Sequence, residues 1–282
     1  MATSLEQPTN PAAMLKSYGL HPKKNLGQNF LVDPAALERV VAAAEIHPDD
    51  SVLEIGAGLG GLTLHLAAAA SRVVAVEIDR QLLPILTANL SGQANVEIQP
   101  GDMLELDPAI LMGSDGYVVV ANIPYYITSA LIRHLLEARV KPARVTLTVQ
   151  KEVAQRITAE PGEMSLLALS VQVYGNTWIA ARIPAGAFYP APNVDSAVVR
   201  VDLYPEPVIP AQQLPAFFKL IKAGFSQKRK TLRNALAAGL HFPAEQALTL
   251  LTTAAIDPQR RAETLSLPEW SRLVQVYTQK PG

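Results

Sequence analysis

Apolar and polar residues along the chain follow two patterns, short apolar runs and longer stretches with helical periodicity. The short runs are rich in β-branched residues and predict strands, at 51–55, 72–77, 95–99, 117–121, 144–150, 178–183 and 197–204. Between several of them, apolar residues recur at helical spacing, most clearly in 62–70, 80–90 and 129–139. Strands that alternate with helices of this length predict βαβ units and a mainly parallel sheet of about seven strands.

Other parts of the chain extend this picture. A short helix is expected near residues 11–18 and another near 151–158, whereas 165–174 can be read as helix or strand. GQNFLVD (27–33) is expected to be a loop that leads into a helix capped by Asp33. After residue 208 the strand patterns stop, and only helical patterns remain, at 217–225, 231–240, 245–253 and 269–277.

These patterns predict an α/β domain followed by a small helical one. We expect an N-terminal arm over residues 1–34, an α/β domain over 35–207 and an all-helical domain over 208–282. A chain of 282 residues is long enough for one large and one small domain.

Composition narrows the class of protein. Hydrophobic residues make up 49% of the chain, charged residues 17%, and the net charge is −1, which is typical of a soluble globular protein. The absence of cysteine excludes disulfides, thiolate metal sites and cysteine nucleophiles, and suits the cytoplasm. The N-terminus lacks the pattern of a signal peptide, and no run approaches the roughly 20 apolar residues of a membrane span. We therefore expect a cytoplasmic protein without a membrane or metal partner.

A glycine-rich turn after the first strand points to a nucleotide cofactor. VLEIGAGLGG (52–61) allows a tight turn and close approach of a ligand to a helix N-terminus, at Gly56 and Gly58. Glu77 ends the next strand, where an acid accepts hydrogen bonds from ribose hydroxyls. A nicotinamide dinucleotide and S-adenosylmethionine both fit this pattern. Asp102, after the third strand, suits an adenine amino group and favours S-adenosylmethionine.

The segment ANIPYY (121–126) suggests what is methylated. The amino nitrogen of adenine is a poor nucleophile, and acceptors that bind its protons favour a more nucleophilic geometry and aim it at the methyl group. The Asn122 side chain and the Ile123 carbonyl can supply such acceptors. Pro124 fixes the turn, and Tyr125 can stack on the base, with Phe188 as the candidate for the opposite side.

Six motifs occur in an order that carries a family resemblance: KKNLGQNFLVD (23–33), VLEIGAGLGGLT (52–63), VVAVEID (73–79), GDML (101–104), ANIPYYITS (121–129) and FYPAPNVDSAVV (188–199). Together they closely resemble the ribosomal RNA adenine dimethyltransferases, above all the bacterial small-subunit branch, which forms N6,N6-dimethyladenosine at two adjacent positions in a loop of the small-subunit RNA.

The resemblance implies a Rossmann-like, seven-stranded class I S-adenosylmethionine methyltransferase domain and an arm that folds over the cofactor. It implies six cofactor-binding positions: Asn29, Leu31, Gly56, Glu77, Asp102 and Asn122. Gln28, Gly58 and Met103 are plausible additions. The arm positions follow from the resemblance alone.

A run of cations near residue 230 indicates an RNA partner. Residues 219–233 contain no acid, and phosphate contacts are expected from Lys222, Lys228, Arg229, Lys230 and Arg233. A second basic cluster, formed by Arg133, Arg139, Lys141 and Arg144, is equally compatible with RNA binding and with a solvated surface. The expected partner is small-subunit ribosomal RNA or the assembling subunit.

Three alternatives remain. A large-subunit adenine methyltransferase of the macrolide-resistance type is disfavoured by the C-terminal segment and the Phe188 loop. A DNA adenine methyltransferase shares the logic of ANIPYY, but no sequence-reading module is evident. A non-catalytic assembly factor does not explain the intact set of cofactor positions. No heptad or exposed apolar stripe indicates more than a monomer.

Overall fold

The structure is a computed structural model that describes residues 10–122 and 127–279. The chain forms two compact units. The first extends to Ala154 and also takes in Trp178–Leu203, and the second combines Gln155–Thr177 with the residues from Tyr204 onward. Residues 155–177, which the sequence places within the α/β domain, therefore group with the C-terminal helices.

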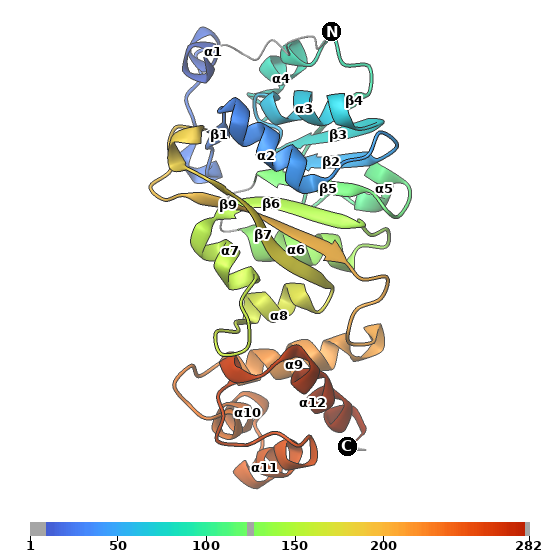
Figure 1. The fold of residues 1–282 in the computed structure, drawn as a ribbon, viewed down its shortest axis with the longest axis vertical. Helices are drawn as coiled ribbons and strands as arrows, with labels where there is room; N and C mark the ends of the chain where they lie inside the picture. Colours follow the sequence, from blue (N-terminus) through green and yellow to red (C-terminus); the bar gives the residue numbers. More distant parts are fainter. Residues whose placement is uncertain (1–9, 123–126, 280–282) are drawn as a thin grey trace. The chain divides into compact units, whose positions relative to one another are not determined.

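A seven-stranded sheet forms the centre of the first unit (Figure 1). Its strands lie in the order β4-β3-β2-β5-β6-β9-β7. Strands β4, β3, β2, β5 and β6 run parallel, and β9 runs antiparallel to β6. The bounds are β2 (Ser51–Ile55), β3 (Arg72–Glu77), β4 (Val96–Pro100), β5 (Val118–Asn122), β6 (Arg144–Gln150), β7 (Gly175–Ile183) and β9 (Ser196–Leu203). This sheet confirms the predicted Rossmann-like fold class.

Helices connect the parallel strands and bury their apolar faces on the sheet. Leu37 and Val40 from α2 and Leu66 from α3 pack in one cluster with Val52 and Val118 of the central strands. The helices of this unit and its border are α2 (Pro34–Ala44), α3 (Gly61–Ala69), α4 (Leu83–Asn89), α5 (Pro108–Met112), α6 (Thr128–Glu137) and α7 (Lys151–Ile157). Every predicted helix of this region is present, and α5 is additional.

The N-terminal arm comprises α1 (Pro11–Ser17), the 3₁₀ turn η1 (Lys24–Leu26) and the short strand β1 (Phe30–Leu31). Strand β1 pairs antiparallel with β8 (Phe188–Tyr189), so that Leu31 faces Phe188. The expectation of a loop over 27–33 was therefore wrong at residues 30–31, where a partner distant in sequence supplies the pairing. The predicted cap is confirmed, because the Asp33 carboxylate accepts from the Ala36 N–H at 2.8 Å.

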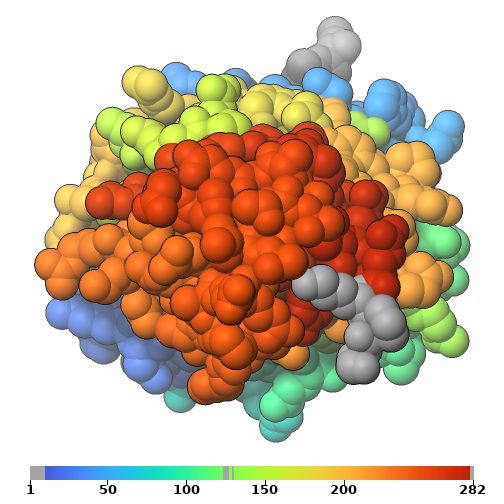
Figure 2. All heavy atoms as spheres, turned by 90° about the horizontal axis from the view of Figure 1, so that it is seen from below, coloured from blue at the N-terminus to red at the C-terminus, as the bar shows by residue number. Residues whose placement is uncertain are grey.

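The second unit contains helices and the first three residues of β7. Residues 165–174, which sequence periodicity leaves open, form the helix α8 (Leu166–Gln172), capped by the Ser165 side chain. Within the described part of the chain after Leu203, all regular structure is helical, as predicted. It comprises α9 (Leu214–Phe225), α10 (Leu232–Leu240), α11 (Ala244–Thr253), α12 (Leu267–Gln279) and short 3₁₀ turns. The atoms of these C-terminal helices are coloured orange to red in Figure 2.

The core of the helical unit is built around Trp270, which is fully buried. Its ring stacks on Phe225, with ring centroids 6.1 Å apart. Gly224 makes room for this ring, because a Cβ on residue 224 would lie 2.6 Å from a Trp270 ring carbon. No helix in the described residues is long and apolar enough to cross a membrane.

The packing around Trp270 gives a first prediction. Gly224→Ala should lower the free energy of unfolding by about 1–3 kcal/mol, because a buried indole has no room to move and overpacking exceeds the gain in helix propensity. Denaturant unfolding of the whole chain measures this change. Gly92→Ala is the control, since a Cβ there meets no atom within 4 Å; equal stability of the two variants would contradict the prediction.

Candidate functional site

The site forms where β2 and β5 lie side by side, because the order of strands reverses at this point of the sheet. In an open α/β sheet, ligands bind at such a switch point, beyond the carboxyl ends of the strands. Ile55 pairs with Ala121, so the next residues, Gly56 and Asn122, are neighbours. Gly56 has φ 83°, and a Cβ there would lie 2.9 Å from the Asn122 carbonyl oxygen. Both the conformation and the close approach require glycine.

Beyond Gly56 the chain turns into α3. Gly58 also has positive φ, at 59°. A Cβ on residue 58 would lie 3.0 Å from the ring of Phe30, so the arm packs directly on the loop. The loop leads into the start of α3, whose first residues Gly61 and Leu62 line the first cavity. A helix start beside a ligand site is the arrangement that phosphate and nucleotide sites use.

Glu77 ends β3 beside this loop and is only 4% exposed. One carboxylate oxygen accepts from the Gly58 N–H and the other from the Asp79 N–H, both at 2.7 Å. Burial raises the pKa of Glu77, and these two hydrogen bonds oppose that rise. The acid predicted to bind ribose hydroxyls is thus bonded to the glycine loop.

Asp102 and Met103 follow β4, the neighbour of β3. Pro100 pairs with Glu77 in register, so Asp102 lies just beyond the strand end next to Glu77. Its side chain accepts from the Leu104 N–H at 2.9 Å, and Met103 is buried. Neither residue is among the described residues that line the two cavities at the site.

The arm covers the switch point. The Asn122 side-chain amide donates to the Asn29 carbonyl at 3.2 Å, which joins the arm to the end of β5. The Asn29 side chain itself donates to the Gly27 carbonyl. Leu31 is buried, and the Val32 N–H donates to the Ala187 carbonyl at 2.9 Å next to Phe188.

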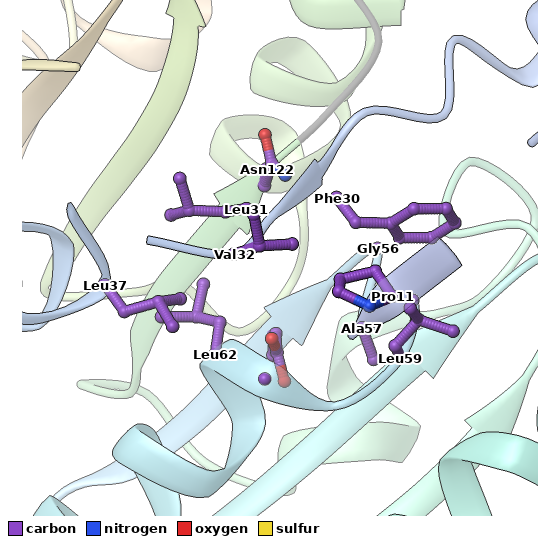
Figure 3. Close-up of a pocket in the computed structure, with 13 residues that line it drawn as sticks. Pro11, Phe30, Leu31, Val32, Leu37, Gly56, Ala57, Leu59, Leu62 and Asn122 are labelled. Carbon is purple, nitrogen blue, oxygen red and sulfur yellow. The ribbon is translucent and has the colours of Figure 1, made fainter. Parts of the chain in front are cut away.

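Two adjoining cavities lie between the arm and the loop, and both are lined by Phe30, Gly56, Gly58 and Asn122. Figure 3 shows the first of them, with arm residues Phe30, Leu31 and Val32 opposite loop residues Gly56, Ala57 and Leu59. Glu54 also lines this cavity. The second cavity adds Gln28, Asn29, Glu77, Ile78, Thr148, Phe188 and Ser196.

The structure therefore brings together most of the residues singled out in the sequence. They are Gln28, Asn29, Leu31, Gly56, Gly58, Glu77, Asn122 and Phe188. Ile123, Pro124 and Tyr125 lie outside the described residues. The binding and catalytic roles assigned to all of these residues stay predictions.

Glu54 is the lining residue that sequence reasoning missed. It is 1% exposed, and neither carboxylate oxygen has a hydrogen-bond partner among the described residues. Burial raises its pKa to about 8, with a smaller contribution from the charge of Glu77. Nearby Thr63 lowers the pKa, although its hydroxyl forms no bond of normal geometry. The sequence signal that could have identified it is a single acid within the otherwise apolar run VLEI (52–55), which predicts a buried carboxyl group.

These residues fit a cationic nucleoside cofactor. The glycine loop presents its backbone to the cavities with no Cβ at positions 56 and 58, and Glu77 ends the neighbouring strand. Burial raises the pKa of Glu54 to about 8 and so favours its protonated form, and a positively charged group in the first cavity would favour the ionised form instead. S-adenosylmethionine combines a ribose with a positive charge. Among the described residues, no cluster of His, Asp or Glu could hold a metal ion.

The predicted RNA-contacting cations lie at the surface of the helical unit. Lys222 is exposed in the last turn of α9, and Lys228, Arg229 and Lys230 are exposed between α9 and α10. Arg233, near the start of α10, is exposed over part of its surface. No ion pair is present for these five side chains in the described structure. Their positive charges can therefore contact an external anion such as an RNA phosphate.

The second basic cluster is partly structural. The Arg144 guanidinium donates to the carbonyls of Ala44 and Glu45 at the C-terminus of α2, at 3.2 and 2.6 Å. Arg133 pairs with Glu137 one turn along α6. Arg133 and Arg144 therefore have structural contacts within the protein that explain why a cation stands at each position.

The sheet order, the glycine-rich loop and the acid that ends β3 are those of a Rossmann-like methyltransferase domain. Residues 19–279 match the model of the family described as ribosomal RNA adenine dimethylase. The chain belongs to the ribosomal RNA adenine dimethylase family, which confirms the resemblance seen in its motifs.

Curated relatives span almost the whole chain. The chain is 46% identical over 269 residues to a ribosomal RNA small subunit methyltransferase A of Dehalococcoides mccartyi strain CBDB1, covering 95% of this chain and 92% of the relative. It is 43% identical to the protein of the same name from Pelotomaculum thermopropionicum, with 95% and 96% coverage.

Solved structures show the same fold. A dimethyladenosine transferase from Plasmodium falciparum is 27% identical with a TM-score of 0.75, over 89% of this chain and 98% of that one. The 23S rRNA methyltransferase ErmE is 29% identical with a TM-score of 0.72, over 89% of this chain and all of that one.

The buried acid Glu54 gives a second prediction. Its folded-state pKa of about 8 lies above the ordinary value of 4.5, so the folded protein holds a proton that the unfolded chain releases between these pH values. The free energy of unfolding should therefore fall as pH rises from about 4.5 to about 8. Glu54→Gln should weaken this dependence and be more stable than the parent at pH 8, by at least about 1 kcal/mol.

Urea unfolding of ligand-free protein at about pH 5.5 and about pH 8, which spans most of this window, measures the effect. Glu105→Gln, which changes a carboxylate outside both cavities, is the control. If Glu54→Gln and the parent lose the same stability between the two pH values, Glu54 does not hold the proton.

Proposed function

We propose that this protein transfers methyl groups from S-adenosylmethionine to the N6 of two adjacent adenines in a loop near the 3′ end of small-subunit ribosomal RNA, forming N6,N6-dimethyladenosine. Membership of the ribosomal RNA adenine dimethylase family supports adenine as the target. The relatives named as small-subunit methyltransferases, at 43% and 46% identity over nearly the whole chain, support the small subunit as the source of the RNA.

One observation carries the proposal: Asn122 stands beside the glycine loop and lines both cavities. Its backbone is held by pairing with Thr148 in β6, and its side chain is held by the bond to Asn29. A side chain fixed in this way can present its amide oxygen to a base amino group next to a cofactor bound at Gly56–Gly58.

The cofactor supplies an electrophilic methyl group on a positively charged sulfur when bound. The other steps belong to the chain itself. Asn122, together with the Ile123 carbonyl, accepts the hydrogens of the adenine amino group, which favours the lone pair needed for attack. Tyr125 and Phe188 hold the base between them. Phe188 is buried on β8, where it pairs with Leu31, and it lines the second cavity. The base must therefore enter that cavity to contact the Phe188 ring.

The helical unit is proposed to bind the RNA backbone. Lys228, Arg229 and Lys230 form an exposed run without a neighbouring acid in sequence. Contacts of this type give affinity that falls steeply with salt and carry no sequence information. The choice of adenine is therefore assigned to the site at β5.

The direct test is methyl transfer from labelled S-adenosylmethionine to unmethylated small subunits, large subunits and naked RNA. Dimethyladenosine at two adjacent positions of the small-subunit RNA is the expected product, located by mass spectrometry. Asn122→Ala should lower the rate by about 100-fold or more at saturating cofactor, as removal of a preorganised polar group does elsewhere.

Asn176→Ala, at an exposed position of β7, is the control and should be unaffected. Label confined to the large subunit would replace the proposal with a large-subunit methyltransferase. Weaker RNA binding but normal transfer to a minimal substrate in Asn122→Ala would contradict the role given to Asn122.

The RNA-binding role gives a further prediction. Replacing Lys228, Arg229 and Lys230 together by Gln should weaken RNA binding and make the slope of log affinity against log salt shallower, by about 0.7–0.9 for each phosphate that is no longer neutralised. Cofactor affinity should not change. Filter binding at several salt concentrations measures this slope, and an unchanged slope would place the RNA contacts elsewhere.

A further inference from the structure

Residues 21–29 of the arm bury no side chain fully, and the last four of them line the second cavity. Apolar burial therefore contributes little to their position, and polar contacts must hold them. The most concentrated polar contacts are at Asp79, which follows β3 two residues after Glu77 and is only 5% exposed.

Asp79 closes a ring of hydrogen bonds with the arm. One carboxylate oxygen accepts from the Lys23 ammonium and the other from the Gln28 side-chain amide, both at 2.8 Å. The Gln28 side-chain oxygen in turn accepts from the Lys23 backbone N–H at 2.8 Å. Burial opposes ionisation of Asp79, but the bonds from Lys23 and Gln28 outweigh it and lower its pKa. The carboxylate is thus charged, and charge-assisted bonds are the stronger kind.

The same residue is joined to the cofactor loop. The Asp79 backbone N–H donates to one oxygen of Glu77, and the Gly58 N–H donates to the other. On the other side of the cavity, Asn122 donates to the Asn29 carbonyl. Neighbouring arm residues are therefore tied to the ends of both β3 and β5.

We propose that Asp79 is a positioning residue that holds arm residues 23–29 over the second cavity and thereby slows the release of the bound cofactor. The nature of that cofactor rests on the proposed function. Asp79 itself acts through Lys23 and Gln28 and is not assigned a contact with the cofactor or the base.

An exchange of charge between two positions tests this role. In Asp79→Asn, the new NH₂ group takes the place of the oxygen that accepts from the Gln28 NH₂ group. Two donors then face each other, and this hydrogen bond of the ring is lost. Adding Gln28→Glu restores the ring, because the new carboxylate at position 28 can accept from both the Lys23 N–H and the new amide at position 79. Both substitutions preserve the size of the side chain, and the double variant has the parent's net charge.

Hydrogen exchange of the ligand-free protein is the first measurement. Amides of residues 23–29 should exchange at least about tenfold faster in Asp79→Asn, which corresponds to about 1.4 kcal/mol. The double variant should return close to the parent's rates. Glu97→Gln, which removes an exposed ion pair to Arg72 with the same 2.8 Å separation as that of Lys23 and Asp79, is the control and should leave the arm unchanged.

The second measurement is the rate at which S-adenosylmethionine dissociates, followed by displacement. It should rise about tenfold or more in Asp79→Asn, whereas kcat at saturating cofactor should change little. The double variant is read by hydrogen exchange alone, because Gln28 lines the second cavity. Unchanged exchange in the arm of Asp79→Asn, uniform acceleration of exchange across the sheet, no recovery of exchange in the double variant, or an unchanged dissociation rate in Asp79→Asn would overturn the proposal. Failure of the wild-type protein to methylate RNA would refute the proposed function alone, since exchange is measured without cofactor.

Discussion

The close approach of Gly56 to Asn122 is the constraint on which the site depends. The two residues follow adjacent parallel strands, and the chain leaves those strands in different directions because the order of strands reverses there. A crevice must open at such a point, and it is narrow, because a Cβ on residue 56 would lie 2.9 Å from the Asn122 carbonyl oxygen. The residue proposed to orient the base thus shares one backbone junction with the loop proposed to hold the cofactor, and neither can move without the other.

The arm completes a site that the sheet leaves open. Phe30 covers Gly58, Leu31 pairs with Phe188, and Asn29 receives the Asn122 amide. Closing the crevice also removes water from it, and burial is the main cause of the raised pKa values of Glu54 and Glu77. The ligand-free protein thus carries a cost in buried acids that a cationic ligand would reduce. The covered pocket and the raised pKa values of its acids are two results of the same geometry, and the proposed cofactor carries the charge that suits them.

Much of this fold could be predicted, because its strands are β-branched runs and its helices have clear periodicity and caps. Asp33 is an example of a local signal that is sufficient by itself. The segment 165–174 is not, since its apolar residues suit either structure and only packing within the second unit decides for a helix. Strand β1 has two residues and pairs with Phe188–Tyr189, far along the chain, so nothing local could reveal it.

The candidate site likewise contains residues that the sequence could predict and residues that it could not. The grouping of Glu77, Gly56 and Asn122 was predictable, because all three follow from strand ends that meet at one edge of the sheet. Asp79 and Glu54 needed coordinates, since their importance lies in burial and in partners that are distant in sequence. Likewise, Arg144 looks like a surface cation in sequence and proves to cap α2.

The way in which the arm is fastened bears on the proposed reaction. Two methyl groups on one adenine require two cofactor molecules, so the cover over the cofactor must open and close between transfers. A lid held by a large apolar surface would open slowly, since each opening exposes that surface to water. Residues 21–29 instead rely on a few polar bonds to Asp79 and Asn122, which water can replace when the segment opens, so that opening exposes little apolar surface. Strand β1, by contrast, is held by its pairing with β8, next to the aromatic residue proposed to hold the base. The arm thus has a paired segment beside Phe188 and a portion held by polar bonds beside the second cavity, and the proposed repeated transfer to one base would use the second as the part that opens.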